Sequence, residues 1–544
     1  MNNQKLFLVI AIFLTIFLLW DKWQITHTVD ANGNTVRKSQ VILDTATKNT
    51  DVPMIETQAI AGGVEGVEID LPMPNIVRKG GFTTVTTDLL TIEISHQGGT
   101  IQSALLNDYP VELKGDEKFQ LLNDKTGTSF QAQSGLASRD DALPTHLSEF
   151  DSANTHYQLF ADELVVPLTW QGKNGVKVVK NFHFKRGSYV VGVDYQITNN
   201  SNQSIPVKSY VRLSRSAIDQ SNMMMPTFTG GLIYDKKNNT VQKNDFEDWG
   251  DFDKQNSVGG WIAMAQQYFM AAWIPSQNEQ QSFSASTTND VYKLTNANQQ
   301  TNVAAGGSAR LNTNQLYIGP KEYGKIEKVA AGLHYTLDYG FLDVLADPLS
   351  WLIHKINDFV GSWGWSIIVI TLLIKLAFYP LSEKSYRSMA GMRKLSPRLA
   401  KLKETYGDDK QKMGQKTMEL YKKEKINPAS GCLPILVQIP VFIAFYWMLL
   451  DTVELRHTAF WWMSDLTEMD PYYILPIIMG ASMFIQQKLN PPPPDPMQAK
   501  IMMSLPFVFT IMFLWFPAGL VLYWVFNNVL SIAQQYTINK RING

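Results

Sequence analysis

The chain has 544 residues, a net charge of −1 and a single cysteine. This length allows two or three domains, the balanced charge gives no overall attraction to nucleic acid, and one cysteine excludes a disulfide within the chain. The mean hydropathy is slightly negative. That average combines a polar first two-thirds with an apolar last third, so the chain has two compositional regimes.

The N-terminal apolar run covers residues 6–20 and is interrupted only by Thr15. It is short for a membrane span, but Trp20 and Trp23 can extend it into the interface. A cleaved secretory signal is the alternative, although no small-residue cleavage site follows. We therefore expect residues 1–23 to form an uncleaved signal-anchor helix, and the polar residues 24–80 to form a flexible tether.

Short runs rich in β-branched and aromatic residues begin near residue 81, with turn sequences such as Lys173-Asn174-Gly175 between them. These runs are residues 83–94, 164–170, 176–184, 189–198, 207–213, 268–274 and 315–318. The pattern predicts an antiparallel β sandwich over residues 81–338, which is long enough to bury its own core. Its histidines lack metal-ligand spacing and no nucleophile or phosphate-binding motif occurs, so we expect a binding or spacer domain without catalysis.

Residues 339–361 carry apolar side chains at helical spacing. They are Leu345, Leu349, Leu352, Ile356 and Phe359. Pro348 fits the first turn of such a helix, with Asp347 as its N-cap. Because a long apolar run follows directly, an amphipathic helix at the membrane interface is favoured over a helix packed in a soluble domain.

Five long apolar runs occupy the last third of the chain and predict membrane spans at residues 363–381, 431–450, 471–488, 500–516 and 518–537. The loop between the first two spans is rich in lysine and arginine, whereas the next loop has a single basic residue, Arg456. The short C-terminal tail, residues 538–544, contains Lys540 and Arg541. The positive-inside rule then places the basic loop and both termini in the cytoplasm, and the β domain outside. With the N-terminal anchor this makes six spans.

The basic loop, residues 383–427, has two helical apolar patterns on either side of Gly407. They predict a helical hairpin whose apolar faces pack together and whose outer surface is basic. The cations that we expect to dock a partner are Arg393, Lys394, Arg398, Lys401 and Lys403. These cations could contact lipid headgroups or an anionic partner such as a ribosome, and the sequence allows both interpretations.

Lys375 is a lone cation inside the first of the five runs. Such a charge costs several kcal/mol unless water or a partner reaches it. Snorkelling to the inner headgroups is one solution. Other polar residues of the spans share its depth and favour a polar interior: Thr371, Gln438, Gln486, Gln487, Asn527, Asn528, Ser531, Gln534 and Gln535. These polar residues could form either a dry hydrogen-bonded plug or a hydrated cavity. No span contains a carboxylate that could pair with Lys375, and this favours the hydrated cavity.

Several motifs together resemble the YidC family of membrane-protein insertases in its Gram-negative form. They lie at residues 87–94, 98–99, 104–106, 379–381, 407–410, 427–434, 470–476 and 513–520. The resemblance covers nearly the whole chain. It implies a membrane α-helical bundle of six transmembrane helices, five of them forming an insertase core over residues 362–537, and a large all-β periplasmic supersandwich of the sugar-mutarotase type.

The resemblance also implies the activity. Members of the family insert and help fold proteins of the bacterial inner membrane, alone or with the Sec translocon (SecYEG with SecDF). They are not enzymes and use no nucleotide, metal or other cofactor. The expected partners are nascent membrane proteins, the ribosome, the Sec translocon and the lipid bilayer. A hydrophilic groove, open to cytoplasm and lipid but closed outside, receives the substrate.

Lys375 corresponds to the cation of that groove and Thr371 to a groove threonine. The other groove residues are expected to be Gln438, Tyr523, Trp524, Asn527 and Ser531. Relatives of this form often carry arginine where this chain has Lys375, and lysine lacks the planar fork that binds a carboxylate with two hydrogen bonds. A solute transporter and an anchored sugar-processing enzyme are less consistent with the sequence, because internal repeats and clustered His/carboxylate residues are missing.

Overall fold

The computed structural model describes residues 81–543, apart from residues 140–141, 173–174, 218–226, 407–408, 425–432 and 491–495. The expected N-terminal anchor, residues 1–23, and the tether, residues 24–80, lie outside the described residues. Two compact units are present. One contains residues 367–439 and 469–543, and the other contains the described residues up to 366 together with residues 440–468.

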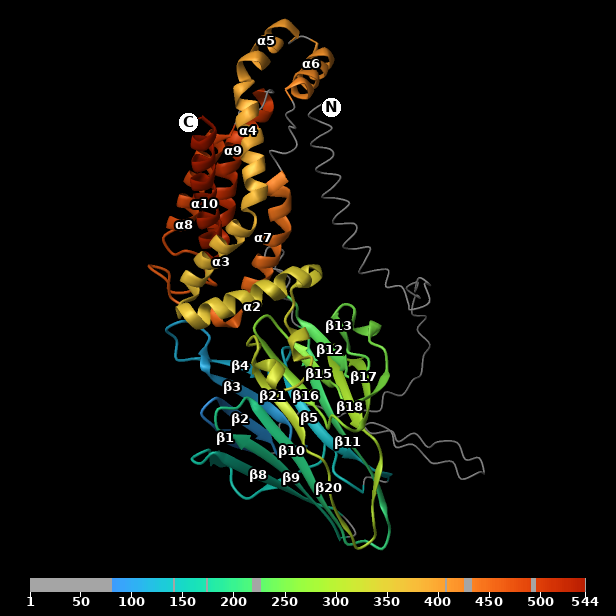
Figure 1. Cartoon of the computed structure of the whole chain (residues 1–544). Coiled ribbons are helices and arrows are strands. Elements are labelled where there is room, and N and C mark those ends of the chain that lie inside the picture. Colours follow the sequence, from blue (N-terminus) through green and yellow to red (C-terminus); the bar gives the residue numbers. More distant parts are fainter. Residues whose placement is uncertain are drawn as a thin grey trace, which may run out of the picture. The chain divides into compact units, whose positions relative to one another are not determined.

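The second unit is built around a β sandwich (Figure 1). Among the described residues, one sheet has 11 strands: β1 (Phe82–Thr86), β2 (Leu90–Ser95), β3 (Ile101–Pro110), β4 (Lys118–Leu122), β5 (Phe130–Ala137), β7 (His156–Gln158), β11 (Ile205–Ser216), β14 (Gln255–Val258), β17 (Gln280–Thr288), β18 (Val291–Asn298) and β19 (Thr301–Val303). Along its main path the strand order is β14-β17-β18-β11-β5-β3-β2-β1-β7.

The other described sheet has 10 strands: β6 (Asp151–Ser152), β8 (Glu163–Gln171), β9 (Val176–Lys185), β10 (Val190–Asn199), β12 (Gly230–Asp235), β13 (Thr240–Asp245), β15 (Trp261–Ala265), β16 (Phe269–Ile274), β20 (Ser308–Arg310) and β21 (Asn314–Pro320). Short 3-10 turns are η3 (Trp249–Asp251), η4 (Ile326–Lys328), η5 (Leu333–Thr336), η6 (Gly340–Leu342) and η8 (Val453–Leu455). The predicted antiparallel sandwich is confirmed, with one exception among the described pairs: β1 runs parallel to β7.

The period-2 pattern of the strands buries one face of each sheet. On β2, Leu90, Ile92 and Ile94 are buried and alternate with half-buried residues. The expected single run over residues 83–94 is instead a hairpin of β1 and β2, because Thr87 bonds to Leu90 through its hydroxyl and backbone and turns the chain. Buried Lys180 of β9 donates to the carbonyl oxygens of Gly98, Gly99 and Ser134.

Helix α2 (Asp343–Val360) follows the sandwich in the same unit. It begins four residues before the expected N-cap Asp347, so Pro348 lies inside the helix and not in its first turn. The tertiary contact from Tyr339 to Ser350, with 3.2 Å between the hydroxyl oxygens, favours this earlier start. Ser350 and Ile353 are buried, whereas Trp351 and Phe359 on the opposite side are exposed.

The first unit is helical (Figure 1). The helices of this part of the chain are α3 (Trp363–Ala377), α4 (Tyr379–Lys394), α5 (Ser396–Tyr406), α6 (Lys410–Lys423), α7 (Leu433–Asp451), α8 (Ile474–Leu489), α9 (Pro496–Met512), η9 (Phe513–Trp515) and α10 (Ala518–Asn543). The division between the units falls within α3 and within α7. Helix α10 packs against α8 and α4, α8 against α9, and α5 against α6. Gly480 permits the α8–α9 approach, since a Cβ there would collide with Thr510.

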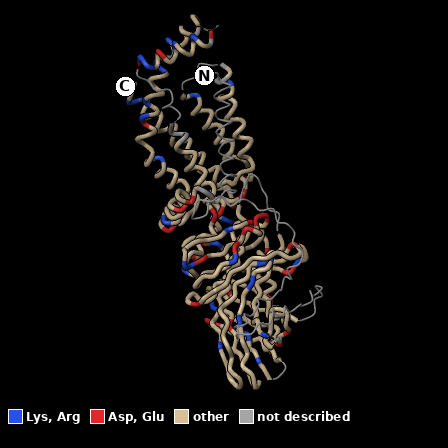
Figure 2. Tube along the Cα trace, turned by 90° about the vertical axis from the view of Figure 1, so that its right-hand side faces the viewer, with Lys and Arg blue, Asp and Glu red and all other residues tan. Residues whose placement is uncertain are grey.

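Helices α3 and α4 meet at Phe378 with a bend of 66°. Within the described residues, no helix taken singly combines the length and apolar character that a bilayer crossing requires, whereas the bent α3–α4 pair meets the criterion jointly. Pro380 sits in the first turn of α4, where its missing N–H removes no helical hydrogen bond. Charged residues concentrate on the hairpin helices and the β domain and are sparse along the apolar helices (Figure 2).

Candidate functional site

Lys375 lies near the end of α3 and is 7% exposed. Its Nζ donates to Ser531 Oγ of α10 at 2.7 Å, and its distance to Gln438 Oε1 of α7 is 3.5 Å. Among the described residues, no carboxylate forms an ion pair with this ammonium. Two of the expected groove residues are therefore brought to Lys375 from positions 63 and 156 residues away, and both are neutral.

Ser531 holds this arrangement together. Its hydroxyl accepts from Lys375 and donates to the carbonyl oxygen of Asn527, one turn earlier on α10, at 2.7 Å. The phenol group of Tyr386 on α4 also interacts with Ser531. The sequence pattern gave no signal for Tyr386, because this tyrosine belongs to the basic loop and not to an apolar run.

Thr371 is buried on α3 and does not bond to Lys375 through its hydroxyl. The hydroxyl donates instead to the carbonyl oxygen of Ile367, at 2.5 Å on the same helix. Such an i−4 bond satisfies a hydroxyl inside an apolar environment without a partner helix. The expected position of Thr371 one turn from Lys375 is seen, but a direct link between the two is not.

Helix α10 has a second polar face, which contacts α8. Asn528 Nδ2 donates to Ser482 Oγ at 3.0 Å, and Gln535 Nε2 donates to Asn490 Oδ1 at 3.1 Å. Asn528 and Gln535 are seven residues apart and thus share a helical face, while Asn527 and Ser531 share another. The polar residues of the last span therefore do not form one cluster around Lys375.

Tyr523 and Trp524 occupy the N-terminal half of α10. Tyr523 is buried. The Trp524 indole packs on Phe513, with ring centroids 5.4 Å apart, and on Phe509, with centroids 6.4 Å apart. Trp524 thus contributes aromatic packing toward α9 and η9, and the structure gives no direct contact between it and Lys375.

The hairpin places its cations on two helices. Arg393 and Lys394 end α4 and are exposed. Arg398 of α5 forms an ion pair of 2.6 Å with Glu424, and exposed Lys401 lies one turn further along α5. Lys403 also lies on α5, and its side chain is outside the described residues.

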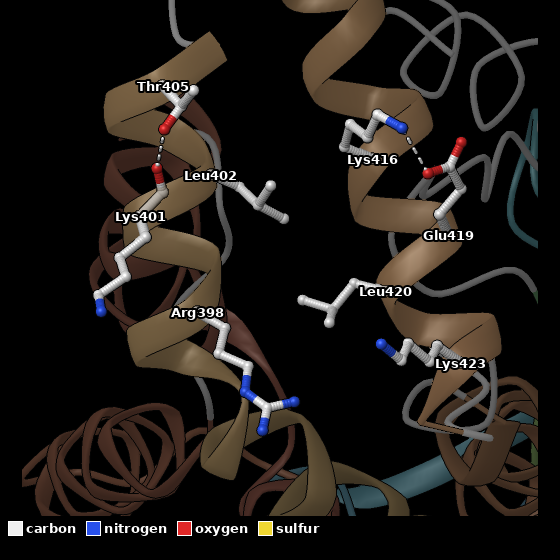
Figure 3. A pocket seen from close by; sticks show the side chains of 8 residues that line it. All are labelled: Arg398, Lys401, Leu402, Thr405, Lys416, Glu419, Leu420 and Lys423. Carbon is white, nitrogen blue, oxygen red and sulfur yellow. Dashed lines mark hydrogen bonds and ion pairs between the residues drawn. The ribbon is translucent and has the colours of Figure 1, made fainter.

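The apolar faces of α5 and α6 pack together only in part: Leu395 and Tyr421 of the predicted apolar set are buried. Leu402 and Leu420 are only half-buried, and a groove of 390 Å³ lies between the two helices. Figure 3 shows both leucines pointing from their helices into this gap. The helices are short, with 11 and 14 residues, which limits the apolar surface that the hairpin alone can bury.

A further buried lysine, Lys321, was not anticipated from the sequence and lies in the unit that contains the β sandwich. Lys321 Nζ donates to Asp451 Oδ1 at 2.6 Å, and the other oxygen of Asp451 accepts from the Asp338 backbone N–H at 3.1 Å. Both side chains of the ion pair are almost fully buried. The pair joins the sandwich to the end of α7.

The segment after Asp451 has further contacts with the sandwich and α2. Arg456 donates to the carbonyl oxygen of Val111 at 2.9 Å. Glu454 accepts from the Tyr323 backbone N–H at 3.1 Å and lies 3.3 Å from His354 of α2. Because these bonds come from far-apart parts of the chain, the loop that follows α7 is firmly fixed to the β sandwich.

The chain matches known proteins along its whole length. Residues 83–352 match the family model described as the YidC periplasmic domain, and residues 355–544 match the 60Kd inner membrane protein family. A relative in Ruthia magnifica subsp. Calyptogena magnifica, named Membrane protein insertase YidC, is 59% identical over 544 residues and both chains are fully covered. The protein of that name in Nitrosococcus oceani is 43% identical, covering 100% of this chain and 99% of the relative.

A crystal structure described as an active YidC insertase with the first transmembrane domain resolved aligns with a TM-score of 0.40 at 18% identity. It covers 85% of this chain and 93% of that one. The assignment rests on the sequence relatives and on the two family models, which together span both units. This chain belongs to the YidC family of bacterial inner-membrane protein insertases, with a periplasmic β-sandwich domain.

Proposed function

We propose that the chain inserts proteins into the bacterial inner membrane and helps them fold, through a hydrophilic groove centred on Lys375. The observation that carries the proposal is the environment of this lysine, which is buried but has only hydroxyl and amide partners among the described residues. A buried ammonium without a carboxylate is incompletely compensated. A substrate carboxylate can therefore bind it transiently without displacing a resident ion pair.

Insertion by this route needs no covalent chemistry. Bringing a polar tail into hydrocarbon is costly, and a polar, hydrated groove with a positive charge lowers that cost. The apolar segment of the substrate then leaves the groove for lipid along the apolar helices. Burial of its methylene groups, at about 0.8 kcal/mol each, supplies the driving force.

The topology belongs to the same proposal. Six spans, including residues 1–23, place both termini and the basic hairpin in the cytoplasm. The apolar helices α7, α8 and α9–η9 support spans over residues 431–450, 471–488 and 500–516. The bent α3–α4 pair supports a first core span that emerges into the hairpin, and α2 with exposed Trp351 and Phe359 supports an interfacial helix.

The partners follow from the charge distribution and the family. Nascent membrane proteins are the substrates, and exposed Arg393, Lys394 and Lys401 of the hairpin suit the anionic surface of a ribosome. The Sec translocon, SecYEG with SecDF, is a further proposed partner. No nucleotide or other cofactor is required.

Depletion of the protein tests the function. Insertion of a single-span substrate with an acidic N-terminal tail, followed by protease protection of the tail, should fall on depletion and return with the wild-type chain. The Lys375→Ala variant should fail to restore it, whereas Lys384→Ala, which removes an exposed lysine of α4, should succeed. Undiminished insertion after depletion would contradict the proposal.

The same substrate with its tail carboxylates changed to amides tests the role of charge. Loss of Lys375 should impair the acidic substrate more than the neutral one. An equal impairment of both would leave the insertase function intact but remove the electrostatic role of Lys375.

A further inference from the structure

The groove between α5 and α6 has matching walls. Each helix contributes four residues at positions i, i+3, i+4 and i+7, which form one helical face. They are Arg398, Lys401, Leu402 and Thr405 of α5, and Lys416, Glu419, Leu420 and Lys423 of α6. The seven-residue spacing makes the groove about 10 Å long, or two helical turns.

The groove has an apolar floor and basic rims. Leu402 and Leu420 point into the gap between the helices (Figure 3). Two rim cations have carboxylate partners within the hairpin: Arg398 with Glu424 at 2.6 Å, and Lys416 with Glu419 at 2.8 Å. Exposed Lys401 and Lys423 form no ion pair with another described residue, so the rims keep an excess of positive charge.

These features select one kind of ligand. Phosphate groups of RNA need cations but gain nothing from a leucine floor. A lipid headgroup likewise offers the groove only its charge. An amphipathic helix, by contrast, offers an apolar stripe for Leu402 and Leu420 and flanking carboxylates for the lysines.

We propose that this groove binds an acidic amphipathic helix of a protein partner, which completes a three-helix arrangement with α5 and α6. The bound helix packs two or three apolar side chains on the leucine floor and directs Asp or Glu toward Lys401 and Lys423. The proposal rests on the proposed function for the cytoplasmic position of the hairpin. Peptide binding to the groove is measured separately from membrane insertion. The groove proposal and the insertase proposal can therefore be contradicted independently of each other.

The probe is a fluorescent helical peptide of sixteen residues with a leucine stripe flanked by glutamates, titrated by anisotropy against the full chain in nanodiscs. A scrambled peptide of equal composition keeps the charge but loses the stripe. The first should bind about tenfold more tightly than the second, because burial of apolar surface contributes beyond the charges. Equal affinity of the two peptides would overturn the proposal.

Two matched pairs of variants locate the site. Lys423→Gln should weaken the peptide about two- to fivefold, whereas Lys422→Gln, which changes an adjacent exposed lysine outside the groove, should have no effect. Leu420→Ser should weaken it about tenfold, and Met418→Ser, at a 50% exposed position outside the groove, should not. Circular dichroism confirms that the helices persist.

Competition identifies the ligand class. A single-stranded RNA oligonucleotide and anionic vesicles are added to the peptide complex at physiological salt. Neither should displace the peptide from the groove. Displacement of the peptide by RNA, with equal losses of peptide affinity in Lys422→Gln and Lys423→Gln, would show a general phosphate-binding surface and overturn the proposal. Displacement by anionic vesicles would overturn it by showing a lipid-binding surface.

Discussion

Lys321 and Lys375 are both buried lysines, but their surroundings differ. The ammonium of Lys321 is held by the carboxylate of Asp451 at 2.6 Å and by the carbonyl oxygen of Thr336 at 3.2 Å. The ammonium of Lys375 has the hydroxyl of Ser531 and a long contact to the amide of Gln438. Lys321 is neutralised by a carboxylate of its own chain and serves the structure, whereas under the proposed function Lys375, with its neutral partners, can still accept a carboxylate from a substrate.

The largest expected effect lies at the neutralised lysine. Asp451→Ala leaves the Lys321 ammonium buried without a carboxylate, so it should destabilise the protein by about 3–5 kcal/mol. The measurement is thermal unfolding of the purified chain in detergent. The double variant Lys321→Met with Asp451→Leu removes both charges and should recover most of the loss. A mild effect of Asp451→Ala alone would show that the pair is not structurally important.

Lys375→Ala should affect insertion strongly and stability weakly, which is the opposite of the effect expected for Asp451→Ala. Lys375→Ala removes a buried charge, and relief of the cost of burying that charge offsets the lost charge-assisted hydrogen bond of about 1.5–3 kcal/mol, so the unfolding temperature should hardly change. Insertion of acidic-tailed substrates should fall about tenfold, which corresponds to about 1.4 kcal/mol. Loss of stability comparable to that of Asp451→Ala would remove the distinction between the two lysines.

Ser531→Ala sharpens the comparison at the partner of Lys375. Loss of one hydrogen bond to the ammonium should slow insertion of acidic substrates by about fivefold at most. Ser482→Ala is the matched control, because it breaks the bond to Asn528 on the other polar face of α10. Ser482→Ala should lower stability and leave the preference for acidic over neutral substrate tails unchanged. Loss of this preference in Ser482→Ala would contradict the division of α10 into two polar faces.

The smallest effect is expected at Asp194, a buried carboxylate with an exposed cation. Burial alone raises the pKa of Asp194, but hydrogen bonds from Arg310, Asn181 and His183 outweigh it and lower the pKa. A lowered folded-state pKa adds stability above the unfolded value of about 3.9, and this is lost as the pH falls through the folded value.

Arg310→Ala should therefore lower the unfolding temperature slightly at pH 7 and progressively less as the medium becomes more acidic than about pH 4. Since the Arg310 side chain is 60% exposed, solvent screening keeps the change small. Thermal unfolding of the full chain across this pH range provides the measurement. A difference that grows toward low pH would contradict the assignment.

Much of this architecture follows from local patterns. Short runs rich in β-branched and aromatic residues, separated by turn sequences, predicted the sandwich. Lys375 was noticeable because it interrupts an apolar run. Lys321 gave no such signal, since it lies in a polar stretch and its partner is 130 residues away. Pairing across that distance depends on the fold, and one sequence cannot reveal it.

Boundaries and faces were also hard to predict. Pro348 suggested a helix start, but the tertiary contact of Tyr339 with Ser350 favours an earlier one. The polar residues of the last span share a depth, yet their helical positions divide them between Lys375 and α8. The hairpin was predicted as a closed pair, whereas its short helices leave a groove. In each case the packing of the fold, which one sequence does not reveal, decided the outcome.

The hydrogen bonds that Lys375 already makes limit how strongly its ammonium can bind a substrate carboxylate. An ammonium has three hydrogens, and Ser531 and the more distant Gln438 face two of them. One hydrogen is left for a substrate, so a carboxylate is held at a single point by a charge-assisted bond of about 1.5–3 kcal/mol. A contact of this strength slows a moving chain by roughly one or two orders of magnitude and then releases it. Under the proposed function, Lys375 would therefore hold a passing carboxylate only briefly.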